Sequence, residues 1–192
     1  MEATSLEIVC IHRARTGREV NYHALVTGED CMDPEDYEPD NFWQTMGGFS
    51  ITRNGYQTIF SSTSFYNVVK CISFLLHSLY WLKGVRSDWF DDPEEHPGDV
   101  VVSTQDGMLR LSMAGGERVA LSYTPDDRNS NPQRGQRYFY EEAFDKQVWA
   151  TEVQKALEEY FTILSFVLDK ADTDDGVEVL RSYRDVWKQA VM

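Results

Sequence analysis

Apolar residues recur with a helical period through the middle of the chain. Between Thr63 and Gly84, aromatic side chains widen a continuous apolar stripe beyond what an ordinary surface helix carries. Its members are Phe65, Val68, Val69, Ile72, Phe74, Leu75, Leu76, Leu79, Tyr80, Trp81 and Leu82. A hydroxyl at Ser62, Thr63 or Ser64 can cap the start of this helix, and Gly84 suits its end. The pattern predicts a central helix over residues 63–84 that other elements cover on more than one face.

Alternating apolar and polar positions predict antiparallel hairpins on both sides of this helix. The strand pairs are Leu6–Arg13 with Val20–Thr27, Phe49–Arg53 with Tyr56–Phe60, and Val100–Thr104 with Met108–Met113. Asn54-Gly55 suits the turn of the second pair, because both residues tolerate positive φ angles. After the third pair, a three-residue loop over Ala114–Gly116 would add another strand to the same sheet. Its apolar face would then hold Val100, Val102, Leu109, Leu111, Met113, Val119, Leu121 and Tyr123.

Two amphipathic helices close the chain. Residues 145–171 carry apolar side chains at helical spacing, and a second helix of this kind runs to about Ala190. A short strand at Arg137–Glu141 precedes them, and no linker is long enough to divide the chain. We therefore predict one α+β domain over residues 1–192. Antiparallel hairpins and a meander would pack on the central apolar helix and the two C-terminal helices.

The chain is strongly acidic. Its 192 residues include 32 acidic and 18 basic side chains, for a formal net charge of −14. This balance disfavours direct nucleic-acid binding and anionic membranes, and it suits solubility or a basic protein partner. The central helix is short for a membrane span and is interrupted by polar residues. Three cysteines without metal-like spacing, and a start without a signal-peptide pattern, favour a cytoplasmic location.

Acidic residues gather in two segments beside large aromatic side chains. Glu29–Asp40 contains seven acids, Asp88–Asp99 contains six, and neither contains a lysine or arginine. Aromatic anchors ringed by charge are typical of interfaces with an oppositely charged partner, although the rings could instead pin the loops to the core. We predict a partner-binding surface made of Asp33, Glu35, Asp36, Tyr37, Glu38, Asp40, Trp43, Trp89, Phe90, Asp91, Asp92, Glu94 and Glu95.

One constellation could carry nucleophilic chemistry. A two-residue turn at Thr16-Gly17 would place Cys10 opposite His23 and His12 opposite Asn21 on the first hairpin. A thiol beside an imidazole could form a nucleophile and base, or part of a metal site. A buried thiol next to a hydrogen-bonded histidine is the simpler interpretation.

Other catalytic and metal-binding signatures are missing from the sequence. It has no Walker phosphate loop, no dinucleotide-binding glycine pattern, no G-x-S-x-G elbow and no H-E-x-x-H. Asp127, Asn129 and Asn131 alternate as calcium ligands do, but Pro132 and Tyr138 stand where glycine and glutamate are required. We therefore predict a protein that is not an enzyme, with no catalytic residue, metal or cofactor. A small enzyme with a Cys–His or carboxylate site, or a self-associating structural subunit, remains the alternative.

The chain resembles the immunity proteins of bacterial toxin systems, which are small, acidic, cytosolic α+β proteins. The likeness lies in the hairpin SITRNGYQTIF leading into the helix FYNVVKCISFLLHSLYWL, and in the meander VVVSTQDGMLRLS with the later helix VWATEVQKALEEYFTIL. The resemblance implies a monomeric or dimeric inhibitor that covers the active site or substrate groove of a cognate toxin, often a basic nuclease. It assigns no role to an individual residue.

Overall fold

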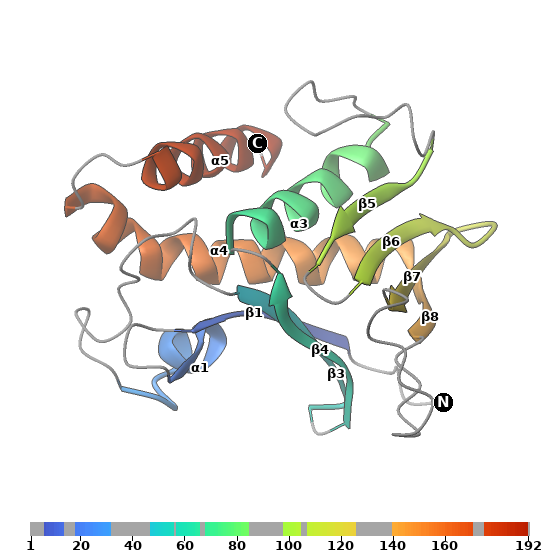
Figure 1. The fold of residues 1–192 in the computed structure, drawn as a ribbon, viewed down its shortest axis with the longest axis horizontal. Coiled ribbons are helices and arrows are strands. Elements are labelled where there is room, and N and C mark those ends of the chain that lie inside the picture. Colours follow the sequence, from blue (N-terminus) through green and yellow to red (C-terminus); the bar gives the residue numbers. More distant parts are fainter. Residues whose placement is uncertain are drawn as a thin grey trace.

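The protein is built from two antiparallel sheets and the helices that cover them. A computed structural model describes residues 6–13, 18–31, 47–55, 57–65, 68–84, 98–104, 107–125, 140–170 and 175–191. In this part of the chain, eight strands form two four-stranded sheets, and four helices accompany them (Figure 1). The predicted α+β fold class is therefore confirmed.

The first sheet has the strand order β2-β1-β3-β4. Its strands are β1 (Leu6–Arg13), β2 (Glu19–Asn21), β3 (Gly47–Arg53) and β4 (Gln57–Phe65), and the short helix α1 (Tyr22–Thr27) follows β2. Because β2 pairs only with Ile11–Arg13, residues 6–10 of β1 have no strand on that side among the described residues. Helices α1 and α4 (Lys146–Lys170) pack against β1 instead.

The second sheet is a meander with the order β5-β6-β7-β8. Its strands are β5 (Val100–Ser103), β6 (Gly107–Met113), β7 (Arg118–Pro125) and β8 (Tyr140–Asp145). Helix α3 (Val68–Leu82) and helix α4 contact strands of both sheets, and α5 (Asp175–Val191) packs on these two helices (Figure 1). Buried side chains from both sheets and all four helices form one hydrophobic cluster.

The predicted hairpin at Asn54-Gly55 and the predicted meander are both present in the structure. Asn54 and Gly55 have φ angles of 55° and 72°, and they connect β3 to β4, with Arg53 paired to Gln57. In the meander, the loop after β6 is longer than the predicted three residues, since Met113 pairs with Val119. The predicted faces nevertheless hold along most of the sheet, because Val100 lies opposite Leu111 and Leu111 opposite Leu121. Among the predicted members of that face, Val100, Leu109, Leu111, Val119 and Leu121 are buried, and Val102 and Tyr123 are partly buried. Met113, at the end of β6, is 49% exposed, so its predicted burial was wrong.

The prediction for the first hairpin was wrong in its second half. Its second strand ends at Asn21, and residues 22–27 form α1 rather than a strand. Asn21 ends the strand because its side chain accepts a hydrogen bond from the Ala24 backbone N–H at 3.0 Å, which makes it the N-cap of a helix. The register also differs, since Ile11 rather than His12 lies opposite Asn21.

The central helix begins later than predicted. Residues 57–65, including the serine- and threonine-rich run before the helix, form β4, and α3 starts at Val68. Pairing with β3 as far as Gly47 opposite Phe65 holds this run extended. The predicted end is correct, because Gly84 has a φ of 68° and its N–H donates to the Trp81 carbonyl at 3.0 Å.

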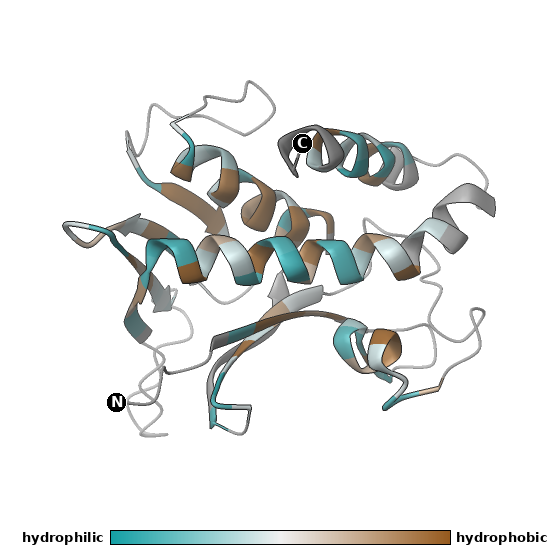
Figure 2. Ribbon diagram, turned by 180° about the vertical axis from the view of Figure 1, so that it is seen from behind, coloured by the Kyte–Doolittle hydropathy of each residue, from teal (hydrophilic) through white to brown (hydrophobic). Residues whose placement is uncertain are grey.

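Helix α4 begins one residue after the predicted start. Asp145 caps it, with Oδ1 accepting hydrogen bonds from the backbone N–H groups of Gln147 at 2.9 Å and Val148 at 3.1 Å. Figure 2 shows hydrophilic residues recurring along α4, whereas α3 is mostly hydrophobic. A larger share of the surface of α3 than of α4 is therefore apolar and suited to burial in the core.

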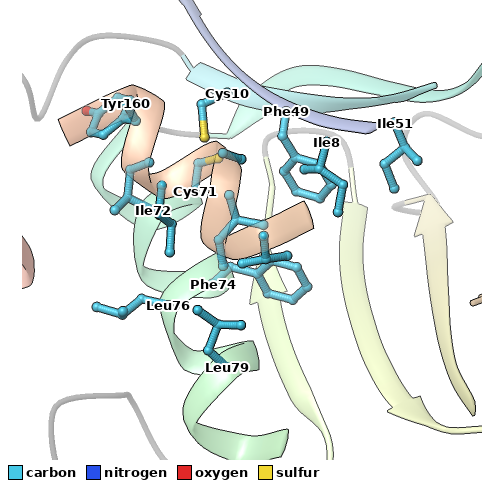
Figure 3. Close-up of a cluster of buried hydrophobic side chains, with 14 of the residues drawn as sticks. Ile8, Cys10, Phe49, Ile51, Cys71, Ile72, Phe74, Leu76, Leu79 and Tyr160 are labelled. Carbon is cyan, nitrogen blue, oxygen red and sulfur yellow. The ribbon is translucent and has the colours of Figure 1, made fainter. Parts of the chain in front are cut away.

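Aromatic side chains join the layers of the core. Phe49 of β3 stacks on Phe74 of α3, with ring centroids 6.1 Å apart (Figure 3). Trp149 of α4 is fully buried beside Phe144, and its indole N–H donates to the Ser78 hydroxyl of α3 at 3.2 Å. That hydroxyl donates in turn to the Leu75 carbonyl, so the buried polar atoms of this contact are paired.

Truncating Trp149 is expected to weaken the whole fold. Trp149→Ala should lower the free energy of unfolding by about 3–5 kcal/mol, because it removes a large buried ring and leaves a cavity. Val148→Ala is the matched control, since Val148 is 38% exposed and should cost less than about 0.5 kcal/mol. Denaturant unfolding followed by circular dichroism measures both. Equal losses in the two variants would contradict this account of the core.

Candidate functional site

Charged side chains gather where β1 lacks a neighbouring strand. We call this group the His23 cluster; its members are Glu7 of β1, His23 of α1, and Glu152, Lys155 and Glu159 of α4. The three α4 residues share one face of that helix because they are spaced by three and four positions. Three elements therefore bring three carboxylates, one imidazole and one ammonium together.

The ring of His23 lies between two carboxylates. Its Nδ1 is 2.8 Å from Glu159 Oε1, and its Nε2 is 3.4 Å from Glu7 Oε1. Glu7 is also 3.7 Å from Lys155 Nζ and accepts a hydrogen bond from the Thr52 hydroxyl at 3.2 Å. Glu7 thus links the β1 edge to β3, α1 and α4.

The cluster contains more carboxylate than its cations neutralise. Burial raises the pKa of Glu152, and Glu7 and Glu159 raise it further, while Lys155 and His23 act in the opposite direction. Glu159 is only 8% exposed. The second carboxylate oxygens of Glu152 and Glu159 are buried without a hydrogen bond to any described residue.

Cys10 and His23 do not lie opposite each other in the structure, contrary to the prediction. Cys10 lies opposite Phe49 on β3, and both ring nitrogens of His23 face glutamates. Burial, and then the nearby Glu159, raise the pKa of the Cys10 thiol, which disfavours the reactive thiolate. Cys10 lies beside Cys71 in the core between β1 and α3 (Figure 3). The hypothesis of a Cys–His nucleophile at this position is therefore wrong.

The predicted partner-binding surface lies outside the described residues. This applies to Asp33, Glu35, Asp36, Tyr37, Glu38, Asp40, Trp43, Trp89, Phe90, Asp91, Asp92, Glu94 and Glu95. The structure does describe Glu29, Asp30 and Asp99 at the ends of the two acidic segments. Asp30 accepts two hydrogen bonds of 2.8 Å from Arg18, and Asp99 lies 3.7 Å from Arg110, whereas Glu29 is exposed.

The sequence analysis also considered a calcium site, other metal sites and a membrane-spanning helix. The calcium-like run at Asp127–Asn131 lies outside the described residues. Within the described ranges, no group of three or more histidine, cysteine, aspartate or glutamate side chains is arranged to hold a metal ion. Among the helices so described, none combines the length and apolar character needed to span a membrane.

Comparisons with protein-family models, with curated proteins and with solved structures found no match. The residues and their arrangement are therefore the basis for inferring a function.

Replacing Glu152 by glutamine is expected to stabilise the protein at neutral pH. Because its pKa is raised on folding, the folded state holds this proton more tightly than the unfolded chain. Protonated Glu152 therefore makes its full contribution to folding stability below the ordinary carboxyl pKa. This contribution is lost as the pH rises through the raised pKa of the folded state. Glutamine resembles the protonated form, so Glu152→Gln should gain about 0.5 kcal/mol at about pH 8 and nothing at about pH 4.

The control for this prediction is Glu158→Gln, which removes the same charge from an exposed position on α4. Urea unfolding at both pH values measures the two variants. A gain that is the same at both pH values, or that Glu158→Gln reproduces, would contradict the electrostatic interpretation.

Proposed function

We propose that this protein binds and neutralises a basic protein partner, and that it is an immunity protein that blocks a cognate toxin in the cytoplasm. The mechanism is steric and electrostatic occlusion by the two acidic segments, without catalysis, metal or cofactor. Supporting this proposal are the placement of charge in the sequence and the general resemblance to immunity proteins.

One observation carries the proposal. The segments 29–40 and 88–99 contain 13 of the 32 acidic residues and none of the 18 lysines and arginines. Outside these two segments, 19 acids stand against 18 bases, so the rest of the chain is nearly neutral. An acidic composition needed only for solubility would not require this concentration, whereas a surface that attracts a cationic partner does.

The aromatic residues in and beside these segments supply the short-range part of the mechanism. Tyr37, Trp43, Trp89 and Phe90 are of the types that anchor interfaces when their rings are buried by a partner. The carboxylates would occupy the cationic surface that a basic toxin uses to bind phosphates. Long-range attraction would then speed encounter, and the rings would slow dissociation.

The two segments leave the described fold at distant places. The first follows α1, and the second follows the C-terminal end of α3 and returns at β5. Figures 1 and 2 both show these points at opposite sides of the molecule. The contribution of each segment to partner binding is therefore best measured separately.

Reversing the charge of one segment is expected to abolish capture of the partner. One variant changes Asp91, Asp92, Glu94 and Glu95 to lysine, and the other changes Asp33, Glu35, Asp36 and Glu38 to lysine. A control changes four exposed acids elsewhere, Glu19, Glu141, Glu158 and Glu178, which alters the net charge equally. Affinity purification of the tagged chain from its source cells, with quantitative mass spectrometry, should show a basic protein retained by wild type and control. At least one segment variant should lose it.

Capture of the same proteins by all four forms of the chain would overturn the proposal. A second arm tests neutralisation directly. The captured protein is expressed in a host with and without the chain, and wild type should restore growth that the affected segment variant does not restore. A captured protein that is harmless to the host would contradict toxin immunity but leave basic-partner binding in place.

A further inference from the structure

Trp81 binds both ends of the chain segment that connects α3 to β5. It lies in the last turn of α3, and its backbone carbonyl accepts a hydrogen bond of 3.0 Å from the Gly84 N–H. Its indole N–H donates to the Gly98 carbonyl at 2.9 Å. Figure 1 shows the C-terminal end of α3 near the start of β5, and the two elements are in contact. One residue therefore joins the point where the chain leaves α3 to the point where it returns.

The side chain of Trp81 is held in a fixed position. Its ring is half-buried and packs against the hydrophobic cluster. The hydroxyl of Tyr80, the preceding residue, donates a hydrogen bond of 3.1 Å to the Val186 carbonyl, which ties the same turn of α3 to α5. A tryptophan side chain has only two rotatable bonds, so it anchors a contact with little loss of conformational freedom. The indole N–H therefore offers Gly98 a donor at a defined place.

Two contacts hold the returning end of the segment just before β5. The first is the Trp81 hydrogen bond to Gly98, which is exposed and has a φ of 101°. The second is the ion pair between Asp99 and Arg110 of β6, at 3.7 Å. Because partly exposed ion pairs contribute little to stability, the hydrogen bond from Trp81 is the stronger of these two contacts.

The segment between Gly84 and Gly98 carries much of the proposed binding surface. Residues 85–97 contain five acids and a single base, Arg86. When the ends of a segment are held together, its charges sample a smaller volume and less freedom is lost on binding. We propose that Trp81 is a positioning residue for partner binding, because its indole N–H holds these ends together. This role rests on the proposed function, whereas the joining of the ends follows from the described contacts.

Trp81→Phe removes the indole N–H and keeps an aromatic ring. The dissociation constant of the captured basic partner should rise by about fivefold, as expected for loss of one hydrogen bond. Trp187→Phe is the matched control, because this half-buried ring also packs on the core, but its N–H donates to no described residue. The control should bind the partner as wild type does.

A further variant shows whether Trp81 acts through the acidic segment. Asp91→Asn combined with Asp92→Asn lowers the negative charge of the segment and should itself weaken binding. Adding Trp81→Phe to this background should cost about twofold or less, because residues that act through one another are not additive. A fivefold loss in both backgrounds, or unchanged binding by the Asp91→Asn, Asp92→Asn variant, would overturn the inference.

Hydrogen exchange of the backbone amides tests the joining of the ends without a partner. Residues 98–101 should exchange about fivefold faster in Trp81→Phe than in wild type, and Trp187→Phe should leave them unchanged. Equal exchange in wild type and Trp81→Phe, or an unchanged partner affinity in Trp81→Phe, would overturn the inference but not the proposed function. If charge reversal of either acidic segment left partner binding unchanged, the proposed function would fail, and the role of Trp81 in it with it.

Discussion

Shared burial of both sheets against α3 and α4 is the constraint on which the rest of this structure depends. Each of these helices contacts strands of both sheets, and the buried residues form one cluster. The Trp149–Ser78 hydrogen bond joins the two helices inside it. Because most of α3 is used for packing, Lys70 is the only lysine, arginine, aspartate or glutamate in that helix, and most charged side chains lie on the other helices, the strands and the connecting segments.

The His23 cluster lies at the one edge where this arrangement leaves β1 without a strand. An unpaired strand edge is a site for unwanted pairing, and natural proteins protect such edges with charges or helices. Here α1 and α4 pack against β1, and Glu7 binds groups from both helices. The carboxylates that protect this edge also help burial to raise the pKa of Glu152.

Much of the fold could be predicted because its signals are local. Asn54-Gly55 identified a hairpin, strand alternation identified the buried face of the meander, and apolar residues at helical spacing identified α4. Alternating apolar and polar positions suggested that the strand continues through residues 22–27, but the Asn21 cap, three positions before the Ala24 N–H, produces a helix. That capping signal was available in the sequence.

The His23 cluster could not be predicted in the same way. Glu7, His23 and Glu159 are far apart in sequence and meet only because β1, α1 and α4 pack together. A repeat of Glu152, Lys155 and Glu159 on one helix face was visible, but it is also what an exposed helix carries. The partner-binding residues were predicted from the positions of acidic residues in the sequence. They lie outside the described residues, which therefore do not test this prediction.

The central claim is that negative charge on two connecting segments attracts a cationic partner. The most direct measurement is the dissociation constant of the complex with its captured partner as the salt concentration rises from about 50 to 500 mM. The account predicts that affinity falls by about tenfold or more, mostly through a slower association rate. An affinity and association rate that do not change with salt would contradict it.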